Sequence, residues 1–114
     1  MVRNFEEVWF DILKVVRGRE KISTICRGIK NIIVKVTPEE IIIRSELSKK
    51  GTLRKLRKED FEYVWEKLVK QGVYGLDDVR GIIGKRAIVC AILSLLNYVE
   101  GNCVNGRVNL RLRE

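Results

Sequence analysis

The side chains that could do chemistry in this 114-residue chain are mainly its 23 lysines and arginines, which exceed the 15 acidic residues and give a net charge of +8. They are concentrated in residues 13–35 and 43–58, and each of these two blocks holds seven bases against one acid. Clustered positive charge attracts phosphate groups and is typical of surfaces that bind nucleic acid. A polyanionic partner is therefore the first expectation.

Few residue types in this chain could act in catalysis, because it contains no histidine. This excludes Ser-His-Asp and Cys-His catalysis, histidine general bases and histidine-containing metal sites. Adjacent acidic residues point to different sides of a helix, so they do not form an acid–base or metal-binding pair. Such pairs are Glu6/Glu7, Glu39/Glu40, Glu59/Asp60 and Asp77/Asp78. We expect a protein that is not an enzyme and that uses no cofactor or metal.

The three cysteines are Cys26, Cys90 and Cys103. Their odd number and the absence of a CxxC pair argue against a disulfide framework and against a thiolate zinc site. Cys90 lies in the apolar run Ala87–Leu96, where a buried thiol is expected and which is too short to cross a bilayer. Residues 1–11 lack a signal-peptide pattern. A cytoplasmic location is expected, and the composition, rich in Ile, Val, Lys, Arg and Glu, is typical of a thermophile.

The elements that must position the basic residues begin with a helix that Asn4 caps and Gly18 ends. Residues 21–30 favour a short helix, although their β-branched side chains also allow a strand. Strands with antiparallel pairing are expected over residues 31–37, 40–47 and 52–57. The last hairpin of this meander carries the second basic block, with Lys49 and Lys50 at its tip.

The second half of the chain is expected to hold helices over residues 59–71, 76–82 and 85–97. Asn105-Gly106 then predicts a two-residue turn, because both residues accept a positive φ. Pairing of Val104 with Arg107 places Glu100 opposite Arg111 and puts the arginines of this hairpin on its polar face.

From residue 58 onward, the order of helix, short helix, break, helix and hairpin resembles a winged helix-turn-helix domain. The resemblance is carried by residues 76–80 (LDDVR), Gly84, residues 85–88 (KRAI) and residues 106–112 (GRVNLRL). It implies that Lys85 and Arg86 enter the major groove of DNA and that Arg107, Arg111 and Arg113 contact phosphates. The apolar sequence after Arg86 leaves open whether residues 85–97 form a recognition helix or a core helix.

A second pattern comprises residues 24–32 (TICRGIKNI) and 36–51 (VTPEEIIIRSELSKKG), followed by a tryptophan-bearing helix. It resembles a small domain attached to some microbial restriction-type and His-Asn-His-type nucleases. The resemblance implies DNA recognition or target presentation, with the nuclease centre on a partner. The positions that it marks are Thr24, Arg27, Asn31, Arg44 and Ser45.

We expect a single compact α+β domain over residues 1–114. Residues 1–57 would supply N-terminal helices and the basic antiparallel meander, and residues 58–114 a winged-helix-like three-helix unit with a C-terminal β-hairpin. The expected DNA contacts are Arg44, Lys49, Lys50, Arg54, Lys55, Lys85, Arg86, Arg107, Arg111 and Arg113.

The expected function is recognition of duplex DNA, in transcription regulation or in restriction and defence, without contact to a membrane. RNA ranks below DNA, because only Tyr63, Tyr74 and Tyr98 are available to stack on bases. The alternative is a protein–protein module, either a homodimer or an accessory subunit of a nuclease, that uses the same basic face and the apolar helices.

Overall fold

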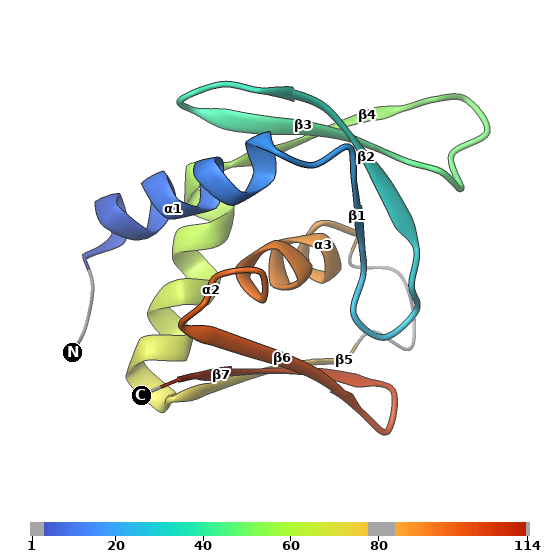
Figure 1. The fold of residues 1–114 in the computed structure, drawn as a ribbon. Coiled ribbons are helices and arrows are strands. Elements are labelled where there is room, and N and C mark those ends of the chain that lie inside the picture. The colour runs from blue at the N-terminus through green and yellow to red at the C-terminus, as the bar shows by residue number, and fades with distance from the viewer. Residues whose placement is uncertain (1–3, 78–83, 114) are drawn as a thin grey trace.

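The computed structural model describes residues 4–77 and 84–113, and these residues form three helices and two antiparallel sheets. The two sheets lie on opposite sides of the helices (Figure 1). One hydrophobic core extends from Val8 in the first helix to Leu110 in the last strand. The architecture is α+β, as predicted. Within the described residues, no helix is both long and apolar enough to cross a membrane.

Helix α1 (Phe5–Arg17) begins at the predicted cap. The Asn4 Oδ1 atom accepts a hydrogen bond from the Glu7 backbone N–H at 3.0 Å, and the Asn4 Nδ2 atom donates to Glu7 Oε1 at 3.0 Å. Five apolar residues of one face are buried. Trp9 on this face donates from Nε1 to the carbonyl of Pro38 at 2.8 Å, which fixes α1 against the turn between two strands.

The first sheet has the strand order β1-β2-β3-β4. Its strands are β1 (Lys21–Ser23), β2 (Lys30–Val36), β3 (Glu40–Ser45) and β4 (Leu53–Arg57). The meander was predicted, but the short helix at residues 21–30 was wrong. Thr24 accepts a hydrogen bond at Oγ1 from the Ile29 backbone N–H at 3.0 Å, and Gly28 has φ 65°, so the chain reverses in a tight turn between β1 and β2.

Helix α2 (Lys58–Gln71) connects the two sheets and buries Phe61, Val64, Trp65 and Leu68. It ends at Gly72, which has φ 78° and donates its backbone N–H to the Leu68 carbonyl at 2.7 Å. The structure confirms this predicted helix.

The second sheet has the strand order β5-β7-β6. Its strands are β5 (Val73–Asp77), β6 (Val99–Val104) and β7 (Arg107–Leu112). Asn105 (φ 51°) and Gly106 (φ 76°) form the predicted turn, and Val104 pairs with Arg107 as predicted. The helix expected over residues 76–82 was wrong at its start, because Leu76 and Asp77 pair with β7. Residues 78–83 lie outside the described residues.

Helix α3 (Gly84–Leu93) is shorter than the predicted helix 85–97, because residues 94–98 form turns. Its residues Ala87–Leu93 are all buried, and Figure 1 shows α3 between the two sheets. A helix that is apolar on all sides belongs to a core. The structure therefore identifies α3 as a core helix and does not confirm the winged-helix arrangement.

Candidate nucleic-acid interface

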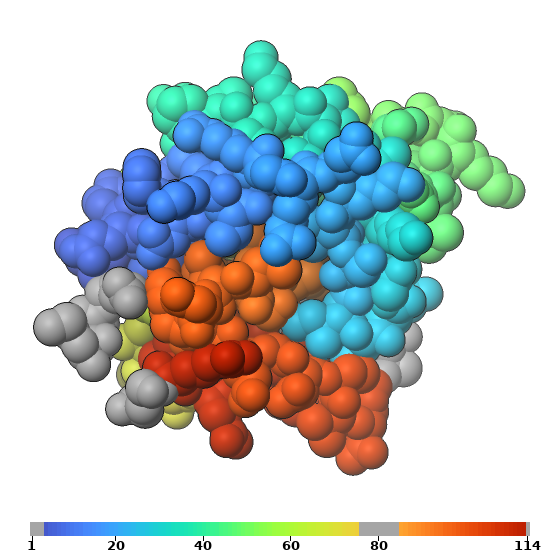
Figure 2. Space-filling view, in the orientation of Figure 1, coloured from blue at the N-terminus to red at the C-terminus, as the bar shows by residue number. Residues whose placement is uncertain are grey.

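The β3–β4 hairpin presents five of the ten predicted basic side chains. Lys49 and Lys50 are exposed in its connection, which projects from the upper right of the molecule in Figure 2. Arg44 extends alongside this connection, since a Cβ atom built on Gly51 would lie 3.7 Å from Arg44 Cδ. Arg44 lies on the outer face of the sheet, because its neighbours Ile43 and Ser45 point inward to the core side.

The free edge of β4 borders an open hollow of about 700 Å³, which we term the β4 hollow. Its residues are Leu53, Arg54, Lys55, Arg57, Glu59, Asp60 and Lys85. It therefore brings together three predicted contacts, namely Arg54 and Lys55 of β4 and Lys85 of α3. It also includes Arg57, which was not predicted as a contact.

Asp60, one of the two acidic residues that line the β4 hollow, already has partners within the protein. Asp60 accepts a hydrogen bond from the Arg57 backbone N–H at 2.8 Å and lies 3.9 Å from the Lys85 ammonium. In the part of the chain that the structure describes, Arg54 and Lys55 form no salt bridge. Their positive charges are therefore available to an external anion.

Arg86 lies at the exposed N-terminal end of α3, but its side chain packs against α2. Its guanidinium lies over the ring of Tyr63, 4.8 Å from the ring centroid. The pKa of Tyr74 is raised, mainly by burial, and Arg86 opposes this shift as a nearby cation and hydrogen-bond donor. The exposed side chain thus links α3 to two tyrosines.

The arginines of the C-terminal hairpin lie away from the β4 hollow. Arg107 and Arg111 are exposed on β7, in the sheet on the other side of the helices, and Arg113 is exposed just after this strand (Figure 1). Glu100 is paired with Arg111, as predicted. The predicted basic patches therefore occupy two surfaces, and the larger one is at the β3–β4 hairpin.

A second cavity, which we term the Asn31 pocket, has a volume of about 530 Å³. It is lined by four of the five positions marked by the nuclease-associated resemblance, together with Arg54 of the β4 hollow. These polar residues are Thr24, Arg27, Asn31, Ser45 and Arg54. Their convergence was not predicted, because they come from a turn and three strands.

The strand register explains this convergence. Asn31 pairs with Ser45 across β2 and β3, and both side chains point to the inner side of the sheet. Further along this side the residues become apolar, with Ile41, Ile43 and Leu56 fully buried. The inner face of this sheet is therefore apolar where it contacts the core and polar at the end that carries Asn31 and Ser45. Ser48 and Thr52 also line the pocket at this end and were not predicted. Ser48 had a sequence signal, because a serine just before a turn often bonds the backbone beyond it, as Ser48 does with the Thr52 N–H.

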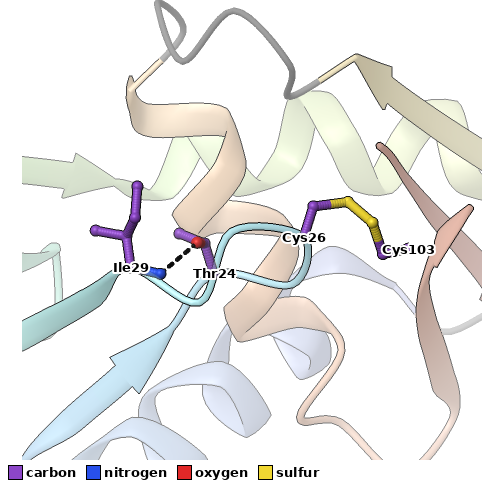
Figure 3. Close-up of a disulfide and its surroundings, with 4 residues drawn as sticks. All are labelled: Thr24, Cys26, Ile29 and Cys103. Atoms are coloured by element: carbon purple, nitrogen blue, oxygen red, sulfur yellow. Dashed lines mark hydrogen bonds between the residues drawn. A yellow bond between two sulfur atoms is a disulfide. The ribbon is translucent and has the colours of Figure 1, made fainter. Parts of the chain in front are cut away.

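A disulfide between Cys26 and Cys103 holds the turn that forms one wall of the Asn31 pocket (Figure 3). The expectation that the cysteines would stay unpaired was wrong for these two, because the fold brings the turn beside the β6–β7 hairpin. Cys90 is buried and outside any disulfide, as predicted. Disulfides are typical of oxidising compartments and also occur inside cells of hyperthermophiles.

The described ranges contain no group of three His, Cys, Asp or Glu residues that could hold a metal ion. Comparisons of the chain with protein-family models, curated proteins and solved structures gave no match. The functional argument therefore rests on the β4 hollow and the Asn31 pocket.

Proposed function

We propose that the protein binds double-stranded DNA without catalysing a reaction on it, and that the β3–β4 hairpin and the β4 hollow contact the phosphates. The observation that carries this proposal is the convergence of Arg54, Lys55, Arg57 and Lys85 on one open surface. Lys49 and Lys50 extend this surface along the hairpin. Positive charge concentrated on one face supplies most of the sequence-independent affinity for DNA.

The dimensions of the edge are compatible with a duplex backbone. A strand of five residues such as β4 spans about 17 Å, and successive base pairs of B-DNA are about 3.4 Å apart, so β4 is about five base pairs long. Its basic residues could therefore follow one strand of the duplex.

Duplex DNA is favoured over single-stranded DNA or RNA by the placement of the aromatic residues. Proteins that bind single strands stack bases on exposed aromatic rings. No aromatic side chain lines the described part of the β4 hollow. Tyr98 donates to Asp11 at 2.7 Å, and Tyr63 lies beneath the Arg86 guanidinium.

A fluorescence-polarisation titration with duplex DNA, single-stranded DNA and RNA over 50 to 200 mM salt tests the proposal. With six or more phosphate contacts, duplex affinity should fall about 10³-fold over this range. The variant Lys49→Gln/Lys50→Gln/Lys55→Gln should reduce the slope of log affinity against log salt by about 2.7, since each contact contributes about 0.9.

The matched control is Lys14→Gln/Arg17→Gln/Lys70→Gln, which removes the same charge from exposed positions on α1 and α2. It should leave the slope nearly unchanged. Equal effects of the two variants, or a slope near zero for the unmodified protein, would overturn the proposal.

Sedimentation of the protein with and without duplex DNA tests the protein–protein alternative. A stable protein complex together with no DNA binding would support that alternative.

A further inference from the structure

We propose that the Asn31 pocket accepts a single nucleotide unit, extruded from the DNA that the β4 hollow binds. The inference rests on the proposed function, because the neighbouring hollow would hold the strand from which the nucleotide comes. Arg54 lines both cavities, so a backbone that follows the β4 edge leads directly to the pocket. The volume of about 530 Å³ lies within the range of small-molecule sites.

The hydroxyl groups of the pocket are arranged to donate hydrogen bonds. The oxygens of Thr24, Ser45 and Ser48 each accept a backbone N–H, from Ile29, Leu47 and Thr52, at 3.0 to 3.1 Å. A hydroxyl that accepts such a bond retains its own proton for another acceptor. Three donors therefore remain for a ligand.

The charge of the pocket selects an anion. Arg27 and Arg54 line it, and no described carboxylate does. A guanidinium offers planar pairs of N–H donors that match phosphate oxygens. Together with the hydroxyl protons, these groups fit a ligand that is rich in acceptors and carries a phosphate.

Asn31 adds a requirement that inorganic phosphate cannot meet. Asn31 as a residue is only 5% exposed, and its Nδ2 atom donates to the Ile29 carbonyl at 3.2 Å. Within residues 4–77 and 84–113, no donor is bonded to its amide oxygen. A buried polar atom without a partner is costly, and an N–H group of a ligand would satisfy it. The edge of a nucleobase carries such groups.

The remaining lining is apolar and could flank a flat ring. Ile29, Leu47 and Ala87 line the pocket beside the polar residues. Extruded bases are held between aromatic or apolar side chains while polar groups bond their edges. The Thr24–Ile29 turn is fixed by its internal hydrogen bonds and by the Cys26–Cys103 disulfide, so this wall is formed before a ligand arrives (Figure 3).

Duplexes that carry 2-aminopurine opposite each of the four bases test the proposal, because the emission of 2-aminopurine increases when it leaves the base stack and mismatches make extrusion easier. Binding to saturation should raise the emission several-fold. The variant Arg27→Gln/Ser45→Ala should lose this increase and still bind the duplex. The control Lys35→Gln, which removes one charge from an exposed position on β2, should retain it.

The second arm titrates the four free 5′-mononucleotides and inorganic phosphate and measures the thermal shift of the protein. Nucleotide binding that requires Arg27 and Ser45, with no increase in emission from DNA, would assign the pocket to free nucleotides. If the emission of 2-aminopurine does not increase and no mononucleotide binds, the proposal that this pocket accepts a nucleotide is overturned. If the duplex still binds through the β4 hollow in that case, the proposed function stands without it.

Discussion

Cys26 and Cys103 are joined by a disulfide that ties the Thr24–Ile29 turn to the β6–β7 hairpin. Their Cα atoms are 5.1 Å apart, although the two residues are separated by 77 positions in the sequence. A crosslink over so long a loop restricts the unfolded chain strongly. Cys26→Ser, or reduction of the wild type, should lower the free energy of unfolding by about 2–4 kcal/mol. Calorimetry with and without reductant measures this loss. The Tm of Cys26→Ser should not respond to reductant, and a response would place the redox-sensitive group elsewhere.

Close packing at Gly101 predicts a second effect on stability. A Cβ atom at this position would lie 2.7 Å from Ser94 Cβ and 3.0 Å from Ile25 Cδ1. Gly101→Ala should therefore separate β6 from the turn that carries Ile25 and cost about 1–3 kcal/mol, the usual cost of overpacking. Urea unfolding measures the change. Gly18→Ala is the matched control, since nothing lies within 4 Å of a Cβ at Gly18, and a similar loss in both variants would contradict the packing argument.

The position of Arg86 predicts a structural effect of its removal. Its guanidinium lies over Tyr63, and such contacts contribute about 0.5–1 kcal/mol at exposed sites. Arg86→Ala should lower the Tm slightly and change the affinity for all duplex sequences alike. Polarisation titrations against a panel of sequences test this. A loss of affinity confined to particular sequences would show that Arg86 leaves Tyr63 and contacts bases.

Tyr74 predicts a dependence of stability on alkaline pH. Burial raises the pKa of its hydroxyl above the ordinary value of 10.0, so the folded state disfavours its ionisation. Its contribution to stability is complete below the pKa of the unfolded chain and is lost as the pH rises through the higher pKa of the folded state. Urea midpoints measured between pH 8 and pH 11 should therefore fall more steeply for the wild type than for Tyr74→Phe. Parallel curves would exclude this role of Tyr74.

The sequence was sufficient to predict those elements whose ends or turns depend on residues close together in the chain. Asn4 caps α1, Gly72 ends α2, and Asn105 with Gly106 sets the register of the last hairpin. Residues 21–30 were misread, because Ile22, Ile25, Cys26 and Ile29 have helical spacing. Pairing with β2 and the bonds of Thr24 prevail over that spacing. Leu76 similarly joins β7, a partner that is 32 positions away.

The chemistry of the candidate site was predicted better than its shape. The hairpin charges are where the sequence indicates them, at Lys49, Lys50, Arg54 and Lys55. The separation of these charges from Arg107 and Arg111 depends on which side of the helices each sheet occupies, and no local pattern encodes that choice. The pairing of Asn31 with Ser45 likewise depends on the register of two strands.

The basic side chains of β4 also protect the protein from its own sheet edge. No described strand pairs with the outer side of β4, so its backbone N–H and C=O groups on that side could accept a strand from another molecule. Lys55 and Arg57 oppose such pairing, because two copies would bring like charges together. Neutralising these residues to weaken DNA binding would therefore also remove a barrier to aggregation, and bound nucleic acid would restore that barrier by covering the edge.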